Sequence, residues 1–349
     1  MTNKASSEAL EGGSPPPDAS PTRRRARGGL TVYILRRVGL GLVTLLVISV
    51  VVFAATQALP GDAAQAILGR NATPASVEAL RTQLGLDQPV WHQYASWLGS
   101  LLRGDLGVSV TGDVPVSQLL GDRVVNSLTL VALVSLIAIP ASLLIGAYAA
   151  VRRDGLFDAS SSLATLVLAA IPEFIVGIGL IVFFATSVLH VLPAVTFLAP
   201  GEAPWSNPRQ LVLPVATLVV AVVPYITRLV RSSMIEVLQS EYVEMARLKG
   251  LRERDVAIVH AGPNALGPAL QAIALTFSYL AGGIVVVEYL FNYPGIGQAF
   301  QSAVAARDVP TIQVIAILIA SVYIIANIVA DVLTILATPR LRTRLGSRR

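Results

Sequence analysis

The sequence contains no cysteine and only two lysines, and each scarcity excludes a class of chemistry. Without cysteine the chain can form no disulfide and carries no thiolate nucleophile. A phosphate-binding loop of the form G-x-x-x-x-G-K-[ST] needs a lysine followed by serine or threonine, whereas alanine follows Lys4 and glycine follows Lys249. The chain is therefore not expected to be an ATPase or another enzyme by itself, or to hold a cofactor.

Histidine is also scarce, and the catalytic motifs that would use it are missing. His92, His190 and His260 lie on different segments without an H-E-x-x-H pattern, so a metal site is not expected. No G-x-S-x-G motif supports a hydrolase. The net charge of +5 comes from basic residues spread along several loops, which does not indicate nucleic-acid binding.

Charged residues make up only 13% of the chain against 54% hydrophobic residues, and the mean hydropathy is +0.68. This composition is typical of an all-α polytopic membrane protein. Six stretches are long enough to cross about 30 Å of hydrocarbon as helices. They run from Val38 to Leu59, Ser127 to Val151, Leu163 to Leu189, Leu211 to Ile226, Pro268 to Val287 and Ile312 to Ala337. In the fourth stretch, Pro214 and Pro224 interrupt the helical pattern and Arg228 cuts it short.

The distribution of basic residues predicts the orientation of these six spans, because positively charged loops stay in the cytosol. If the N-terminus is cytosolic, the inner segments hold 20 of the 26 lysines and arginines and the outer segments hold six. Both termini are therefore predicted to be cytosolic. The residues on the outer side are Arg70, Arg81, Arg103, Arg123, Arg209 and Arg307.

The segments outside the spans divide into tails and one large loop. Residues 1–30 are rich in Pro, Ser, Gly and Arg and are predicted to form a disordered basic tail, and residues 343–349 form a second basic tail. Residues 31–342 then form the six-span domain. Within it, residues 60–125 are predicted to be an extracytoplasmic helical insertion. One helix should start with Thr73 as N-cap and Pro74 at its first position, and another should start at Pro89 and stop at Gly104. Packing of the second helix onto the chain's own spans is the default expectation.

Three carboxylates lie in or beside the predicted spans. Glu173 follows Pro172 in the third span, where a kink could line a cavity, so Glu173 is a candidate for the transport pathway. It could equally be a helix-packing contact or remain neutral. Glu288 and Asp331 lie nearer the ends of their spans, where hydrated structural roles are expected.

The segment EYVEMARLKGLRERD, residues 241–255, is the densest run of charge in the chain. From Arg231 to Asp255 five basic residues balance five acidic ones, which favours a solvated face or a protein-docking surface over lipid binding. A short helix that ends at Gly250, and a second one from Leu251 to His260 that Gly262 and Pro263 stop, would make a compact knob. Residues 228–263 are therefore predicted to be a cytosolic docking region.

This segment resembles the E-A-A-x-x-x-G-x9-I-x-L-P signature of the permease subunits of ATP-binding-cassette importers. Glu244, Ala246, Gly250 and Pro263 match it, while Met245 replaces the first alanine, His260 the isoleucine and Gly262 the leucine. The similarity to the oligopeptide/dipeptide/nickel branch continues from about Val32 to Arg342. Its segments are YILRRVGLGLVTLLVISVVVF, LPGDAA, ATPASVEALRTQLGLDQP, QYASWLGSLLRGDLGVSV, NSLTL, EYVEMARLKGL, VVVEYLFNYPGIGQ and ADVLTILATPRLR.

The resemblance implies a type I importer permease with six spans in a bacterial plasma membrane. It implies three kinds of partner: two cytosolic ATPase subunits that bind the ATP, a second six-span permease that is a different chain, and an extracytoplasmic binding protein that delivers short peptides. It also implies that the knob is the coupling helix. The implied coupling residues are Glu244, Ala246, Arg247, Lys249 and Gly250.

Three alternatives remain open at this point. The cargo could be nickel or another small solute. The chain could be a secondary transporter driven by protons through Glu173 and Asp331, which would need no ATPase. It could also be a membrane anchor that only assembles other proteins. The charged segment broken by a glycine favours the importer over the last two.

Overall fold

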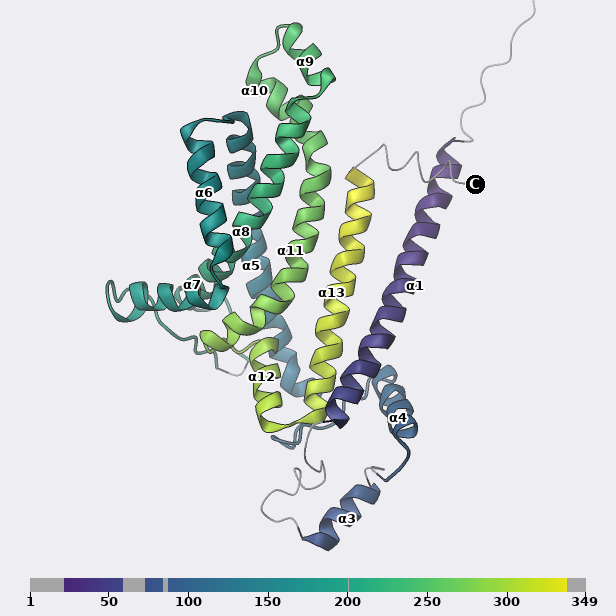
Figure 1. Ribbon diagram of the computed structural model, residues 1–349. Helices are drawn as coiled ribbons and strands as arrows, with labels where there is room; N and C mark the ends of the chain where they lie inside the picture. The colour runs from purple at the N-terminus through teal and green to yellow at the C-terminus, as the bar shows by residue number, and fades with distance from the viewer. Residues whose placement is uncertain (1–21, 59–72, 84–86, 200, 338–349) are drawn as a thin grey trace, which may run out of the picture.

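The computed structural model describes residues 22–58, 73–83, 87–199 and 201–337, and this part of the chain is almost entirely helical (Figure 1). Outside the helices, its only β-type pairing is an isolated bridge between Val108 and Pro115. In chain order the helices are α1 (Thr22–Gln57), α3 (Pro74–Gln83), α4 (Val90–Leu102), α5 (Val116–Val151), α6 (Leu156–Ala170), α7 (Glu173–Leu180), η2 (Ile181–Thr186), α8 (Pro208–Leu238), α9 (Glu241–Leu248), α10 (Glu253–Asp255), η3 (Val256–Ala261), α11 (Gly262–Leu290), α12 (Ile296–Ala306) and α13 (Val309–Ala337).

Four helices of the described residues are long and apolar enough to cross a membrane. They comprise Val32–Gln57 of α1, Val116–Val151, Pro208–Leu238 and Val309–Val329 of α13. The predicted fifth span lies within α11, a continuous helix of 29 residues. α1 begins at Thr22, within the stretch expected to be disordered, whereas residues 1–21 and the C-terminal tail lie outside the described residues.

The predicted third span is not one straight helix. α6 ends at Ala170, and α7 with η2 leaves it at an angle of 100° after the break at Ile171 and Pro172. The backbone of both break residues is extended, because Pro172 disfavours the helical conformation for the residue before it. The kink expected at Pro172 is therefore present and much sharper than a bend within a helix. In Figure 1, α7 runs sideways, across the direction of α6, and it packs against α8 and α11.

The predicted interruption of the fourth span is wrong, because α8 continues through Pro214 and Pro224 for 31 residues. A proline inside a helix frees the carbonyl four residues earlier. For Pro214 this is the Gln210 carbonyl, which accepts a hydrogen bond from Thr196 Oγ1 at 3.3 Å. Of the four helices named above, α8 is the most enclosed, with 56% of its most apolar window buried against 11% in α1. Neighbouring helices therefore hold it straight enough to continue.

α8 lies at the centre of the bundle, between α5 and α11 (Figure 1). Leu130 and Val134 of α5, Leu218 and Ile226 of α8, and Val287 of α11 are almost fully buried in one core. The outward faces of α1, α5 and α6 carry exposed leucines and valines instead. Such apolar faces suit a lipid surrounding and are uncommon on a soluble protein.

The predicted insertion helices are confirmed at the ends that the structure describes. Thr73 Oγ1 accepts a hydrogen bond from the Ser76 N–H at 3.2 Å, so Thr73 caps α3. α4 starts directly after Pro89 and lies against the end of α1, where Trp97 contacts Phe53 with ring centroids 5.7 Å apart. The expected packing of this helix onto the chain's own span is confirmed. Gly85, the predicted stop of α3, lies outside the described residues.

Candidate coupling site

The predicted knob is present as residues 240–261, and it forms one end of the molecule (Figure 1). We call this the knob end, and the end that carries α4 and α12 the opposite end. α9 runs from Glu241 to Leu248 and ends in a turn at Gly250. Gly250 has a φ of +79°, a left-handed conformation that glycine adopts without steric cost. The glycine therefore allows the chain to reverse after α9.

The second half of the knob differs from the prediction of a short helix ended by Gly262 and Pro263. Only Glu253–Asp255 is α-helical, and Val256–Ala261 continues as a π-helix. Gly262 and Pro263 do not stop a helix but begin α11. Proline is favoured at the first positions of a helix, because its missing N–H would have no partner there.

The knob is fixed to the ends of three long helices by apolar packing. Val243 and Ala246 of α9 are buried together with Met234 of α8. Ala150 at the end of α5 and Ala265 near the start of α11 complete the contact. Ala246, one of the residues expected to couple to a partner, thus lies inside the protein. Its small side chain lets α9 pack closely on the bundle.

The opposite face of α9 is exposed and apolar at its centre. Tyr242, Met245 and Leu248, spaced three residues apart, have exposed fractions of 40%, 57% and 77%. Glu244 and Lys249 are exposed beside them. An apolar centre with a charged rim is the composition of a protein-docking surface rather than of a purely solvated helix.

Arg247, also expected to contact a partner, is held within the knob. Its Nε and Nη2 atoms donate to the two carboxylate oxygens of Glu253 at 2.9 and 3.3 Å. Nη1 also donates to the Leu238 carbonyl at 3.3 Å. The guanidinium therefore ties α8, α9 and α10 together across the Gly250 turn.

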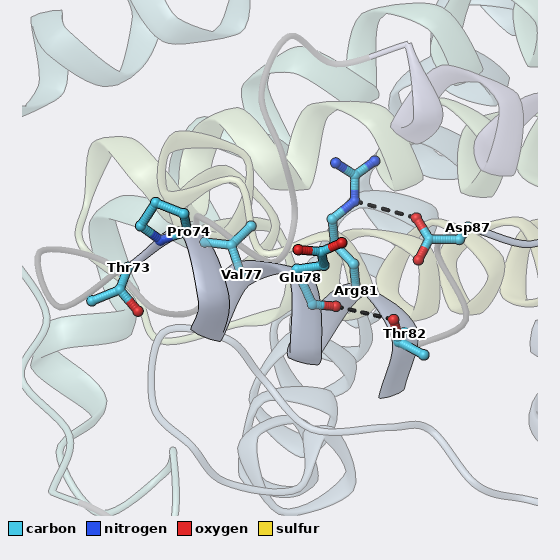
Figure 2. Close-up of a pocket in the computed structure, with 7 residues that line it drawn as sticks. All are labelled: Thr73, Pro74, Val77, Glu78, Arg81, Thr82 and Asp87. Atoms are coloured by element: carbon cyan, nitrogen blue, oxygen red, sulfur yellow. Dashed lines mark hydrogen bonds and ion pairs between the residues drawn. The ribbon is translucent and has the colours of Figure 1, made fainter.

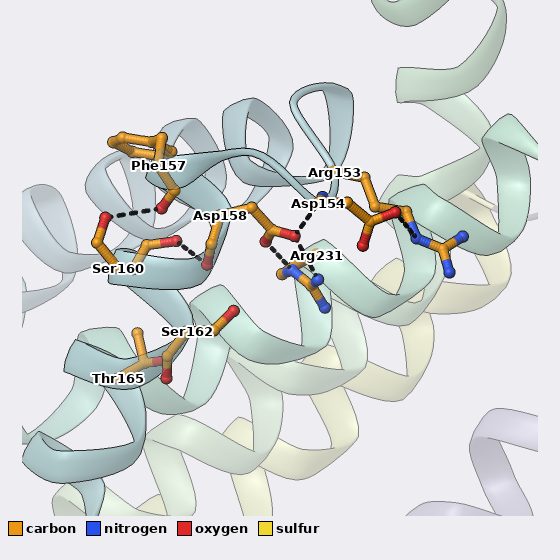
Figure 3. A network of polar contacts seen from close by, with 9 residues as sticks. Arg153, Asp154, Phe157, Asp158, Ser160, Ser162, Thr165 and Arg231 are labelled. Carbon is orange, nitrogen blue, oxygen red and sulfur yellow. Dashed lines mark hydrogen bonds and ion pairs between the residues drawn. The ribbon is translucent and has the colours of Figure 1, made fainter.

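A buried ion pair that the sequence did not predict lies near the knob. Asp158, in the first turn of α6, accepts two hydrogen bonds from Arg231 of α8, one from Nε and one from Nη2 at 2.7 Å (Figure 3). The Asp154 N–H donates to the same carboxylate at 3.0 Å. The Asp158 side chain is 5% exposed and that of Arg231 29%. The sequence does contain a sign of this pair. Asp158 and Arg231 have opposite charges, and each interrupts an apolar segment near the same predicted face of the membrane.

Glu288 is a second buried carboxylate, at the opposite end of the bundle, and its predicted hydrated role is wrong. The residue is fully buried, and Oε1 accepts from the Ser127 hydroxyl at 2.5 Å. Oε2 accepts from the Gly297 N–H at 2.6 Å, at the start of α12. Water is excluded because the turn after α11 folds back and places α12 over this side chain. We call Glu288, Ser127, Asn126, Tyr293 and Gly297 the Glu288 cluster.

The remaining members of the Glu288 cluster tie the turn to α5. Tyr293 Oη donates to the Asn126 carbonyl at 2.8 Å, and Asn126 Nδ2 donates to the Pro294 carbonyl at 2.9 Å. Burial, with a smaller contribution from the Glu288 charge, raises the pKa of the Tyr293 phenol above its usual value, so that it remains a donor. A Cβ atom on Gly297 would overlap the Val285 backbone, so glycine is required for this close approach. The cluster explains physically why FNYPGIG follows Glu288.

The other two candidate carboxylates have different settings. Asp331 forms an ion pair with Arg37 of α1 at 2.5 Å, which agrees with the structural role expected for it. Glu173 is the first residue of α7, directly after the sharp bend, and is partly buried. Among the described residues, no three His, Asp or Glu side chains come together as a metal site would require.

A polar hollow lies on the insertion at the opposite end. Thr73, Glu78, Arg81 and Asp87 are among its lining residues, and Arg81 Nε is 3.5 Å from Asp87 Oδ1 (Figure 2). Its volume is about 610 Å³. All of these side chains are exposed, so the hollow is a feature of the surface rather than an enclosed binding site.

Comparison with known proteins identifies the family of the chain. Residues 142–343 match the family described as "Binding-protein-dependent transport system inner membrane component", and residues 30–134 match the N-terminal part of such components. A peptide transport system permease protein of Brucella abortus is 34% identical over 313 residues, which cover 90% of this chain and 99% of the relative. A peptide ABC transporter permease protein of Sinorhizobium fredii is 35% identical, with 89% and 99% covered.

A third relative extends the comparison to another named cargo. The glutathione transport system permease protein of Escherichia coli O6:H1 is 35% identical over 311 residues, which cover 89% of this chain and 98% of the relative. The matches include the spans, the knob and the Glu288 cluster. The chain therefore belongs to the inner-membrane permease components of binding-protein-dependent ABC transport systems and is a multi-pass protein of the plasma membrane.

Proposed function

We propose that the chain forms half of the translocation pathway of an ATP-driven importer of short peptides. The observation that carries the proposal is the exposed apolar face of α9, formed by Tyr242, Met245 and Leu248 on a knob packed against three long helices. An apolar face projecting from the bundle needs a protein partner. A cytosolic ATPase subunit fits, because the chain has no phosphate-binding loop of its own.

The contacts of the knob support a coupling mechanism. When ATP draws two ATPase subunits together, a knob seated on one of them must move with it. Val243 and Ala246 are packed against Met234, Ala150 and Ala265, so the movement reaches α8, α5 and α11 together. Closely packed interfaces transmit displacement because they have little free volume to absorb it. The spans then reorient between an outward-open and an inward-open state.

The proposed topology places the knob end in the cytosol. Six spans with both termini cytosolic put the basic residues of the knob and of the loop after α5 on the inner side, as the positive-inside rule requires. The α3–α4 insertion and α12 then face outward, where an extracytoplasmic binding protein would deliver its cargo. A second six-span permease would complete the pathway.

Short peptides are the proposed cargo because two of the relatives described above are named for peptide transport and the third for glutathione transport, and glutathione is a small peptide. The settings of the carboxylates argue against a proton-driven carrier. Asp331, one of the two residues that such a carrier would use, is paired with Arg37. Nickel or another small solute is the alternative cargo, and an uptake assay that compares peptides with nickel tests it.

Purification of the tagged chain from cells that contain its native neighbours tests the assembly. We expect mass spectrometry to find two ATPase subunits and one further six-span permease with the chain. Recovery of the chain alone, even after crosslinking at residues 241–255, would overturn the importer assignment. Uptake that requires only a proton gradient would support the carrier instead.

Two variants test the knob itself. Gly250→Pro places a fixed negative φ where the turn needs +79°, and Glu244→Lys reverses a charge beside the apolar face. We expect both variants to insert normally and to lose ATP-driven uptake. Glu236→Lys is a control, because Glu236 is exposed on α8 outside the knob. Normal uptake in the Gly250 and Glu244 variants would contradict the coupling role.

A further inference from the structure

The Asp158–Arg231 ion pair links the helix that supports the knob to the bent arm made of α6, α7 and η2. We propose that this pair is the positioning contact through which α6 and α7 follow the movement of the knob. The proposal rests on the proposed function and adds a transmission element to it. Three observations support the proposal. The pair lies close to the knob along α8, few other residues of α6 are buried, and the contact is bidentate.

Arg231 is close to the knob along α8. Met234, which is buried against the knob residues Val243 and Ala246, lies three residues further on. At about 1.5 Å rise per residue, the two positions are separated by less than one helical turn. A displacement of the knob that moves Met234 must therefore move the backbone of Arg231 as well.

α6 has few other buried attachments. Only Asp158 and Thr165 of its 15 residues are buried. Leu156, Leu163 and Leu166 have exposed fractions of 91%, 63% and 56%, so they face away from the bundle. Exposed apolar faces against lipid can slide, since lipid tails are as apolar as leucine. The ion pair is thus a charged, directional attachment of α6 to α8, in addition to the packing of the two helices.

The geometry of the pair holds α6 and α8 in a fixed position relative to each other. Arg231 Nε donates to Asp158 Oδ1 and Nη2 donates to Oδ2. This bidentate contact fixes the relative orientation as well as the separation of the two helices. The Asp154 N–H holds the carboxylate from the loop between α5 and α6 (Figure 3). Separation of the charges in a largely buried setting is costly, because each would lose its partner without full hydration.

The bent arm made of α6, α7 and η2 also contacts the bundle beyond the bend. After the 100° bend, α7 packs against α8 and α11, where Gly177 is buried between Thr217 and Leu290. Glu173, the candidate pathway residue, begins this helix. A movement of α6 at the knob end would therefore reposition the start of α7.

The decisive variant is Asp158→Asn, which keeps the shape and removes the charge. Arg231 is 29% exposed, so its guanidinium can gain water and the chain should still assemble. In reconstituted complexes with the ATPases, the second permease and the binding protein, we expect ATP hydrolysis within about twofold of the native rate. Peptide uptake should fall by about tenfold, the scale of one lost hydrogen bond to a charged group. Arg231→Lys, which keeps the charge but loses the fork, should be intermediate.

Asp154→Asn is the matched control. It removes the charge of an exposed acid in the loop before α6, 3.6 Å from Arg153, and keeps the backbone N–H that donates to Asp158. We expect it to leave uptake and hydrolysis unchanged. Because the native chain has no cysteine, spin labels can be placed at Phe174→Cys in α7 and Glu236→Cys in α8 alone. In the native complex, the distribution of distances between the labels should not change when ATP binds. In the Asp158→Asn complex, this distribution should become broader.

The outcomes separate the proposals. Uptake within about twofold of native in Asp158→Asn would overturn the link. A distribution of label distances that is as narrow in the Asp158→Asn complex as in the native complex would overturn it as well. Loss of uptake only in proportion to lost assembled complex would assign the pair a purely structural role and also overturn it. Failure of the native chain to bind ATPases or to support ATP-driven uptake would instead overturn the proposed function.

Discussion

The two ends of the bundle each bury a carboxylate, but they stabilise it in different ways. At the knob end Asp158 meets the guanidinium of Arg231. At the opposite end Glu288 is fully buried and accepts its hydrogen bonds from neutral groups, the Ser127 hydroxyl and the N–H groups of Gly297 and Gln298. Both carboxylates accept hydrogen bonds, but only Asp158 accepts them from a group of opposite charge.

This difference indicates different mechanical roles. An ion pair between two helices joins elements that can move as bodies relative to the rest of the protein. A carboxylate that receives backbone N–H groups at the start of a helix instead completes a local fold, because those donors have no intrahelical partner. We therefore expect changes at the knob end to affect transport first and changes at the opposite end to affect stability first.

Replacement of Glu288 should produce the largest loss of stability. Glu288→Leu leaves the Gly297 N–H and the Ser127 hydroxyl buried without their acceptor, at about 1–3 kcal/mol for each group. Glu288→Gln keeps an acceptor oxygen, and Ser127 can turn to accept from the new amide. We expect a large fall in the thermal midpoint of the detergent-purified Leu variant and a small one for Gln. Equal falls would show that the charge itself matters here, as at Asp158.

Replacement of Gly297 should produce the second largest loss of stability. Gly297→Ala forces a Cβ atom against the Val285 backbone, and such overpacking typically costs about 1–3 kcal/mol. Gly282→Ala is the matched control in α11, because a Cβ there meets nothing within 4 Å. Thermal stability should fall for the first and hold or rise slightly for the second. A stable Gly297→Ala protein would mean that α12 can shift away from α11 without cost.

Tyr293→Phe should have a moderate effect at the same end. The variant removes the hydroxyl that donates to the Asn126 carbonyl at 2.8 Å and leaves the ring in place. One lost buried hydrogen bond corresponds to about 1 kcal/mol. The thermal midpoint should therefore fall less than in Glu288→Leu, while uptake per assembled complex stays native. Lost uptake in a stable Tyr293→Phe complex would contradict a purely structural opposite end.

The sequence predicted the features that depend on neighbouring residues and missed those that depend on topology. The Gly250 turn, the Thr73 cap and the start of α4 after Pro89 are local patterns, and all three are present. Asp158 and Arg231 are 73 residues apart, so only the packed bundle brings them together. The burial of Glu288 likewise depends on α12 folding back over it, which composition does not reveal.

The prolines predicted the course of the helices correctly at one position and incorrectly at others. Pro172 indicated a kink but not its angle of 100°, which depends on the packing of α7 against α8 and α11. Pro214 and Pro224 suggested an interruption that the enclosed position of α8 prevents. Pro263 predicts the end of a helix from its sequence context, whereas in the structure it lies at the start of α11. Whether a proline ends, bends or begins a helix was decided by the neighbours of that helix.

The smallest effect on stability is expected at Arg247, and it sharpens the contrast between the ends. The Arg247 side chain is 39% exposed and that of Glu253 65%, so their ion pair should contribute less than about 1 kcal/mol. If Arg247 acts only by holding the Gly250 turn, Arg247→Gln and Glu253→Gln should reduce uptake equally. If Arg247 instead binds the ATPase, only its own replacement should weaken the copurification of the ATPase subunits. The double variant decides between these readings, because two residues that act through one shared contact give no further loss when both are changed.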